Sequence, residues 1–129
     1  MDKIKINFLH ICENAFFAQD KKLNIIGIFD QINVEGLPAL HPKFSIAINV
    51  SGTVYDKKKV LEIISPSNKA IISPEMESEK LENKPKANMV INIVGLQFDE
   101  EGNYKIILKI NDIIVSPERE DFFAVKKLS

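Results

Sequence analysis

Alternating apolar and polar residues begin near the start of the chain and recur further along it. In residues 3–12, every second side chain from Ile4 to Cys12 falls on one face, and residues 43–52 repeat the pattern. Successive side chains of a strand point to opposite sides of a sheet, so a period of two predicts β-strands with one buried face. In the second segment, the residues expected to face the core are Phe44, Ile46, Ile48 and Val50.

The rest of the chain also reads as strands. Residues 22–34 carry isoleucines on both faces and predict a central strand. Residues 74–84 are the best helix candidate, but Met76 and Leu81 cannot supply the apolar stripe that a docked helix needs, so a strand edge leading into a loop is expected. Further segments rich in Ile, Val and Phe, which favour strands, are 58–66, 68–73, 87–98, 103–110 and 121–128.

Seven or eight short strands separated by turn residues predict an all-β fold. We expect an immunoglobulin-like antiparallel β-sandwich that forms a single domain over residues 1–129. The chain has no tryptophan, so the tryptophan-and-disulfide core of antibody domains is absent and membership of the antibody family is excluded.

The stretch "FDEEGNYKIIL", residues 98–108, supports the sandwich. In immunoglobulin-like folds, a tyrosine near the start of a late strand donates its hydroxyl to backbone a few residues upstream. Tyr104 fits that position, and Gly102 suits the turn before it because glycine adopts positive φ without strain. We therefore predict that Tyr104 is buried, with its hydroxyl bonded to backbone between Leu96 and Glu101. The next turn, Asn111-Asp112, suits a two-residue hairpin.

The acidic residues of this stretch, Asp99, Glu100 and Glu101, raise calcium binding as an alternative. Calcium takes six to eight oxygen ligands, usually from carboxylates spaced through a loop. Adjacent side chains of an extended backbone point to opposite sides, so three consecutive carboxylates do not converge on one ion. We therefore prefer the interpretation in which residues 99–101 form a corner that leads Tyr104 into a buried strand.

Composition limits the function classes. The chain has 129 residues, enough for a core without disulfide or metal, and its net charge of −1 lacks the basic excess of nucleic-acid binders. Neither a signal peptide nor an apolar run of membrane-spanning length is found. The single cysteine, Cys12, fits a reducing compartment. We expect a soluble, cytoplasmic protein that contacts neither nucleic acid nor membrane.

His10, Cys12 and His41 are the best candidates for chemistry. Imidazole and thiolate are zinc ligands, so the three residues could form a site if the fold brought them together. His10 and Cys12 also lie on an apolar face, where cysteine behaves as a small hydrophobe. We favour that alternative and expect no metal, no cofactor and no catalytic residue, because no convergent acid, base and nucleophile are visible.

Residues 12–50 resemble a family of small bacterial proteins of unassigned function. These pair an N-terminal strand, ending near an acidic residue and alanine, with a strand of the form K-L-x-I-x-G-I-F-D-x-I. A P-A-x-H-P loop then leads into a valine- or isoleucine-rich strand. The resemblance implies a β-sandwich and carries no activity, substrate or catalytic residue. The matching residues are Glu13, Ala15, Lys22, Leu23, Ile25, Gly27, Ile28, Phe29, Asp30, Ile32, Pro38, Ala39, His41 and Pro42.

Two function classes stay open. A non-catalytic protein-interaction module is preferred, with homo-oligomer formation through a sheet edge as one possibility. A small-ligand or carbohydrate-binding domain is the alternative, although only Tyr55 is left as an exposed tyrosine if Tyr104 is buried. For the module, residues 33–44 are the expected interaction loop, because prolines stiffen it while it carries apolar side chains. Its interacting residues would be Val34, Leu37, Leu40 and His41; alternatively, the leucines plug the open end of the sandwich.

Overall fold

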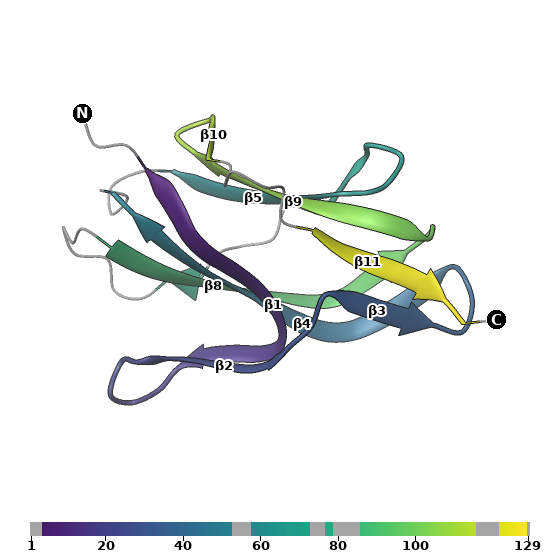
Figure 1. Cartoon of the computed structure of the whole chain (residues 1–129), viewed down its shortest axis with the longest axis horizontal. Coiled ribbons are helices and arrows are strands. Elements are labelled where there is room, and N and C mark those ends of the chain that lie inside the picture. The colour runs from purple at the N-terminus through teal and green to yellow at the C-terminus, as the bar shows by residue number, and fades with distance from the viewer. Residues whose placement is uncertain (1–3, 53–57, 73–76, 79–85, 116–121, 129) are drawn as a thin grey trace.

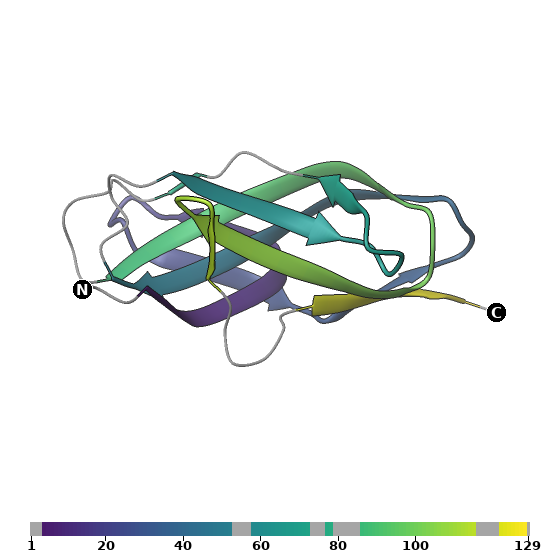
Figure 2. The same ribbon diagram turned by 90° about the horizontal axis from the view of Figure 1, so that it is seen from above.

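The computed structural model describes residues 4–52, 58–72, 77–78, 86–115 and 122–128. Within these ranges the chain forms strands and no helix, which confirms the all-β prediction. The strands form two sheets packed face to face (Figures 1 and 2). They are β1 (Lys5–Phe17), β2 (Leu23–Ile28), β3 (Gln31–Val34), β4 (Ala39–Ser51), β5 (Lys59–Ile64), β6 (Ala70–Ile72), β7 (Glu77–Ser78), β8 (Lys86–Phe98), β9 (Gly102–Ile110), β10 (Ile113–Val115) and β11 (Phe122–Lys127).

The first sheet has the order β2-β1-β4-β8-β7, and the second has the order β3-β11-β9-β5-β6 with β10 paired to β9. The pairs are antiparallel except for β3 and β11, which run parallel. The prediction of a purely antiparallel sandwich is wrong at that pair. After β2 the chain leaves the first sheet and adds β3 to the edge of the second, where β11 runs in the same direction.

Strands β4 and β8 supply much of the inner face of the first sheet, and the predicted facing of β4 is confirmed. Its four expected core residues are fully buried. Paired residues of neighbouring strands lie on the same side of a sheet, so the partners of these four also face inward. The inward pairs are Phe44 with Ile93, Ile46 with Ile91, Ile48 with Met89 and Val50 with Ala87.

The inward alternation of β8 changes phase at Gly95. Ile93 and Leu96 are both buried although they are three residues apart, and Val94 between them is exposed. Gly95 has φ of +67°, a left-handed conformation that glycine adopts readily. Gly95 therefore changes which residues of β8 face inward, so that Leu96 and Phe98 lie in the core.

An aromatic cluster joins the two sheets at this end. Phe98 of the first sheet meets Tyr104 and Phe123 of the second edge-on, with ring centroids 5.2 and 5.9 Å apart. Tyr104 and Phe123 stack at 5.4 Å, and Phe44 meets Phe123 at 5.7 Å. Edge-on and stacked pairs of this kind add stabilisation beyond the area they bury.

The chain passes from β8 in the first sheet to β9 in the second through residues 99–101. Tyr104 is 1% exposed, and its hydroxyl donates a hydrogen bond of 2.6 Å to the carbonyl oxygen of Glu100. Gly102 has φ of +133°, and a Cβ there would lie 2.8 Å from the ring of Pro66. Both features agree with the corner predicted from the sequence.

The acidic side chains of the corner accept hydrogen bonds from two different sides. Gln97 Nε2 donates to Asp99 Oδ1 at 2.8 Å, while Ser67 Oγ donates to Glu100 Oε2 at 2.6 Å. Glu101 is exposed. The first two carboxylates therefore fasten the corner to its neighbours instead of converging with the third.

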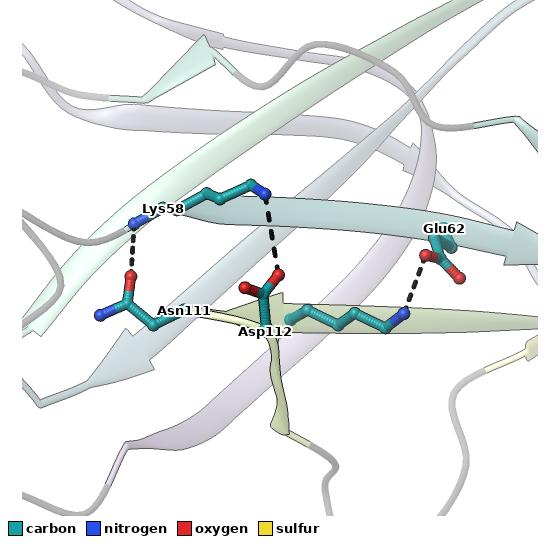
Figure 3. A network of polar contacts seen from close by, with 5 residues as sticks. Lys58, Glu62, Asn111 and Asp112 are labelled. Atoms are coloured by element: carbon teal, nitrogen blue, oxygen red, sulfur yellow. Dashed lines mark hydrogen bonds and ion pairs between the residues drawn. The ribbon is translucent and has the colours of Figure 1, made fainter.

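The turn at Asn111 and Asp112 forms as predicted, with positive φ at both residues and β10 pairing back on β9. Figure 3 shows how the turn is held against the start of β5. The backbone amide of Lys58 donates to Asn111 Oδ1 at 2.9 Å, and Lys58 Nζ lies 3.7 Å from Asp112 Oδ1. Further along β5 and β9, Lys109 Nζ donates to Glu62 Oε1 at 3.0 Å.

Two segment assignments are wrong. Residues 22–34 were expected to be one central strand, but they form β2 at the edge of the first sheet and β3 in the second. The bend at Asp30 separates the two strands, and Gly27, near the end of β2, has φ of +71°. Residues 33–44 were expected to be a loop, but β4 begins at Ala39 because this stretch pairs with the end of β8. Tyr55 and most of the segment 74–84 lie outside the described residues.

Replacing Tyr104 by phenylalanine removes the hydroxyl and keeps the ring. We expect the Tyr104→Phe variant to lose about 1–2 kcal/mol of unfolding free energy, because the Glu100 carbonyl oxygen loses its donor. Urea titration followed by circular dichroism measures the loss. An unchanged midpoint at unchanged slope would contradict the role of this bond in the corner.

The Tyr104→Phe variant should also change how the unfolding free energy depends on pH in alkaline solution. Burial raises the pKa of Tyr104 above its ordinary value of about 10, and the Glu100 and Asp99 carboxylates raise it further. In the unfolded chain the phenol ionises first, so stability is lost as the pH rises above about 10. Unfolding free energies of the wild type and the variant should therefore converge as the pH increases through this range. A constant difference between the two proteins would contradict the raised pKa.

Candidate functional site

The segment formed by β1 and β2 turns away from the first sheet and covers its outer face. Residues 5–12 of β1 pair with β4, and residues 12–17 pair with β2, so the strand changes partner at Cys12. Figures 1 and 2 show the β1–β2 hairpin turning back and crossing the sheet on the side opposite to the core. We call residues 13–28 the hairpin.

One side of the hairpin packs on the sheet and forms a second, smaller core. Cys12, Ala47 and Val90 are buried on the outer face of the sheet. Ala15 is buried with them, and three half-buried hairpin residues complete the cluster. These residues are Phe17, Leu23 and Ile25. The hairpin therefore adds a partial third layer to the sandwich.

The other side of the hairpin faces water and carries both apolar residues and amides, because Asn14 pairs with Ile26 and Asn24 pairs with Phe16. Phe16, Ile26 and Ile28 are 40, 51 and 60% exposed, and they alternate with the hairpin residues that pack on the sheet. We call these three residues the hairpin face. The sequence showed isoleucines on both sides of this segment; Ile25 packs on the sheet, whereas Ile26 and Ile28 stay exposed.

Local sequence explains the shape of the hairpin. Its turn is closed by two backbone bonds, from Lys21 N to Ala18 O and from Ala18 N to Lys22 O, at 2.8 and 3.0 Å. Lys21 takes the left-handed conformation, as expected in a three-residue hairpin loop. At the other end, a Cβ on Gly27 would lie 2.9 Å from the side chain of Glu13, so glycine leaves room for that carboxylate.

The residues of the expected interaction loop divide between two environments. Val34 is half-buried against the main core, and the ring of His41 lies 5.6 Å from Phe44 and 6.5 Å from Phe98. Leu37 is half-buried, whereas Leu40 is 69% exposed. Val34 and His41 therefore help to close the end of the sandwich, and Leu40 is directed toward solvent.

The three candidate zinc ligands do not come together. His10 and Cys12 lie on the outer face of the first sheet, opposite Ala47 and Ser45. His41 contacts core aromatic rings on the inner side. Within the described residues, no group of three or more His, Cys, Asp or Glu side chains could hold a metal ion.

Cys12 is a free, buried thiol. It is fully buried, and its Sγ lies 3.5 Å from the carbonyl oxygen of Ser45. Burial raises the pKa of the thiol above its ordinary value, against a lowering effect of Lys43. A nucleophilic cysteine needs a lowered pKa and access to solvent, so this environment disfavours a catalytic role.

A row of amide side chains crosses the remaining outer face of the first sheet. Asn7 Nδ2 donates to Asn49 Oδ1 at 2.8 Å, and Asn49 Nδ2 donates to Asn88 Oδ1 at 2.6 Å. Beside this row, the rings of Phe8 and His10 stack at 5.1 Å. These amides hydrogen-bond largely to one another, and the bonds link β1, β4 and β8.

A family model described as a family of unknown function, DUF6941, matches residues 7–116. The match agrees with the expectation that the chain is one of a family without an assigned activity. No curated protein and no solved structure matches the chain. In the part of the chain that the structure describes, no helix has the length and apolar character to span a membrane.

The two leucines of residues 33–44 can be separated by experiment. We expect Leu40→Ser to change the free energy of unfolding by less than about 0.5 kcal/mol, because Leu40 is exposed, and the half-buried Leu37→Ser to lower it more. Urea denaturation gives these values, and pull-down from native cell extract gives the effect on binding. Lost binding at retained stability would assign an interface to Leu40, whereas a large loss of stability in Leu40→Ser would contradict its placement in solvent.

Proposed function

We propose that this chain, which belongs to the DUF6941 family of unknown function, is a non-catalytic protein-interaction module that docks through the hairpin face. The exposure of Phe16, Ile26 and Ile28 on one side of one hairpin is the observation that carries the proposal. Grouped apolar side chains on a surface typically mark interaction sites, whereas single exposed ones need no explanation.

The energetics favour docking on this face. Burial of an isoleucine or phenylalanine side chain is worth about 1.5–3 kcal/mol relative to full exposure. The three side chains are already partly covered, so each has only part of this energy left to gain. The β1–β2 turn and the packing of Phe17, Leu23 and Ile25 hold the hairpin in place, so little conformational entropy is lost on binding.

We also infer an immunoglobulin-like topology. The orders β1-β4-β8-β7 and β11-β9-β5 correspond to the ABED and GFC sheets of the immunoglobulin sandwich, and the Tyr104 corner lies at the start of the strand equivalent to F. Such sandwiches host many unrelated functions, so the topology does not indicate what this chain binds. The proposal of docking depends on the hairpin face alone.

The alternative classes have weaker support. A carbohydrate or small-ligand site on the outer face would have to use amides that already bond to one another. An enzyme would need an activated group, and the thiol of Cys12 is buried with a raised pKa. A free, buried cysteine fits a reducing compartment, so we place the module in the cytoplasm.

The test compares two pairs of exposed isoleucines. The Ile26→Asn/Ile28→Asn variant changes the hairpin face, and Ile113→Asn/Ile114→Asn, on β10, is the matched control because its side chains are 69 and 54% exposed. Each tagged protein is used to capture proteins from native cell extract, and circular dichroism verifies its fold. We expect the hairpin variant to bind about tenfold more weakly or worse, because a buried apolar contact is lost. Unchanged capture by the folded hairpin variant would contradict the proposal.

A further inference from the structure

We propose that the hairpin, residues 13–28, is a lid that opens as a unit while both sheets of the sandwich stay folded. Opening uncovers the thiol of Cys12 together with Ala47 and Val90, which the hairpin covers on the outer face of the first sheet. Proteins open locally as well as globally, and segments with few buried apolar contacts open most readily.

The hairpin packs on the sandwich through the smaller core. Within the described residues, the main core includes no residue of 13–28. Ala15 is buried in the smaller core, whereas Phe17, Leu23 and Ile25 are half-buried there. Apolar burial stabilises in proportion to the area removed from water, so this packing holds the hairpin less firmly than the main core holds a strand of the sandwich. Lifting the hairpin takes no residue out of the main core.

The backbone of the hairpin pairs within the hairpin. In the described sheets, β2 has β1 as its one neighbour, and beyond Cys12 the one partner of β1 is β2. A two-stranded hairpin without further strands is marginally stable in water. Lys43 Nζ donates to Asn14 Oδ1 at 3.0 Å and joins the hairpin to β4, but this bond is exposed, so water can replace either partner.

The base of the hairpin is fixed at both ends, which confines the movement to the residues between them. On the incoming side, residues 8–12 of β1 pair with β4. On the outgoing side, Phe29 N donates to Ile11 O at 2.8 Å, and Ala124 N of the second sheet donates to Asp30 O at 2.9 Å. Phe29 also packs against the main core. The two anchors belong to the sandwich, so they persist when the hairpin lifts.

Opening changes what the outer face presents. Ala47 and Val90 become an exposed apolar patch, and Phe16, Ile26 and Ile28 lose the packed hairpin that holds them together as the hairpin face. The docking surface proposed above is then present in the closed state alone. This consequence rests on the proposed function, whereas the opening itself needs no partner.

Thiol labelling of the full chain with the disulfide reagent DTNB tests the opening. Cys12 is the one cysteine of the sequence, so the reaction reports on that position. Cys12→Ala/Ala47→Cys moves the thiol to a second position under the hairpin. Cys12→Ala/Val50→Cys moves it to the inner face of the same strand, in the main core. Rates are measured in increasing urea below the unfolding transition, which circular dichroism locates for each protein.

We expect the thiols at positions 12 and 47 to react about a hundredfold faster, or more, than the thiol at position 50, because the hairpin opens without global unfolding. Their rates should rise little with urea, since the urea dependence scales with the surface exposed, whereas the rate at position 50 should follow the global transition. Equal rates and equal urea dependence at the three positions would overturn the inference. A fast reaction at position 12 alone would also overturn it, because a lid has to uncover position 47 as well.

Two substitutions on β2 test whether the packing of the hairpin controls the opening. Ile25→Thr removes a side chain that packs on the sheet, and Ile26→Thr is the matched control on the exposed side; threonine keeps the β-branched shape at both positions. We expect Cys12 to react about tenfold faster in Ile25→Thr and within about threefold of the wild-type rate in Ile26→Thr. An unchanged rate in Ile25→Thr would overturn the inference.

The lid and the docking face fail separately. Labelling is measured on the purified chain, whereas docking is measured by capture from extract. Slow labelling of Cys12, with capture that still depends on Ile26 and Ile28, removes the lid alone. Fast labelling of Cys12, with unchanged capture by the Ile26→Asn/Ile28→Asn variant, removes the docking face and leaves the lid in place.

Discussion

The hydrogen bond between the Tyr104 hydroxyl and the Glu100 carbonyl oxygen fixes the point where the chain crosses from one sheet to the other. The crossing takes three residues, so the ends of β8 and β9 can take few relative positions. The same tyrosine ring stacks on Phe123 and meets Phe98 edge-on, and one side chain thereby sets both the corner and the spacing of the sheets.

Because the interior is filled by apolar side chains, an interaction surface must lie outside it. The outer face of the first sheet is divided between the hairpin and a row of amides that bond across three strands. Folding the hairpin over the sheet buries Cys12, Ala47 and Val90, and it leaves Phe16, Ile26 and Ile28 on the opposite side. The packing that covers one apolar surface therefore creates another.

Residues 33–44 and the hairpin face differ in how well the sequence predicts them. Apolar residues among prolines drew attention to residues 33–44, but pairing of β4 with β8 turns most of that segment into strand and directs His41 toward Phe44 and Phe98. The isoleucines of β2 suggested a central strand, since a strand apolar on both faces is usually covered on both. Gly27 is the local signal of the hairpin, because its φ is positive and a Cβ there would lie 2.9 Å from Glu13, but a lone glycine in a strand does not reveal which sheet follows.

The sequence by itself determined the all-β class, the facing of β4, the Tyr104 corner and the turn at Asn111 and Asp112, because a period of two and turn chemistry are local properties. Only the tertiary structure decided that β1 changes partner at Cys12, that β3 runs parallel to β11 and that β2 lies at an edge. These features depend on contacts between residues distant in sequence. Alternation shows which side chains share a face only while the strand stays regular. The register shift between Ile6 and Phe8 places Ile6 in the main core and Cys12 in the outer cluster, so the single face expected for residues 4–12 is wrong. The neighbouring strands then decide whether a face is covered.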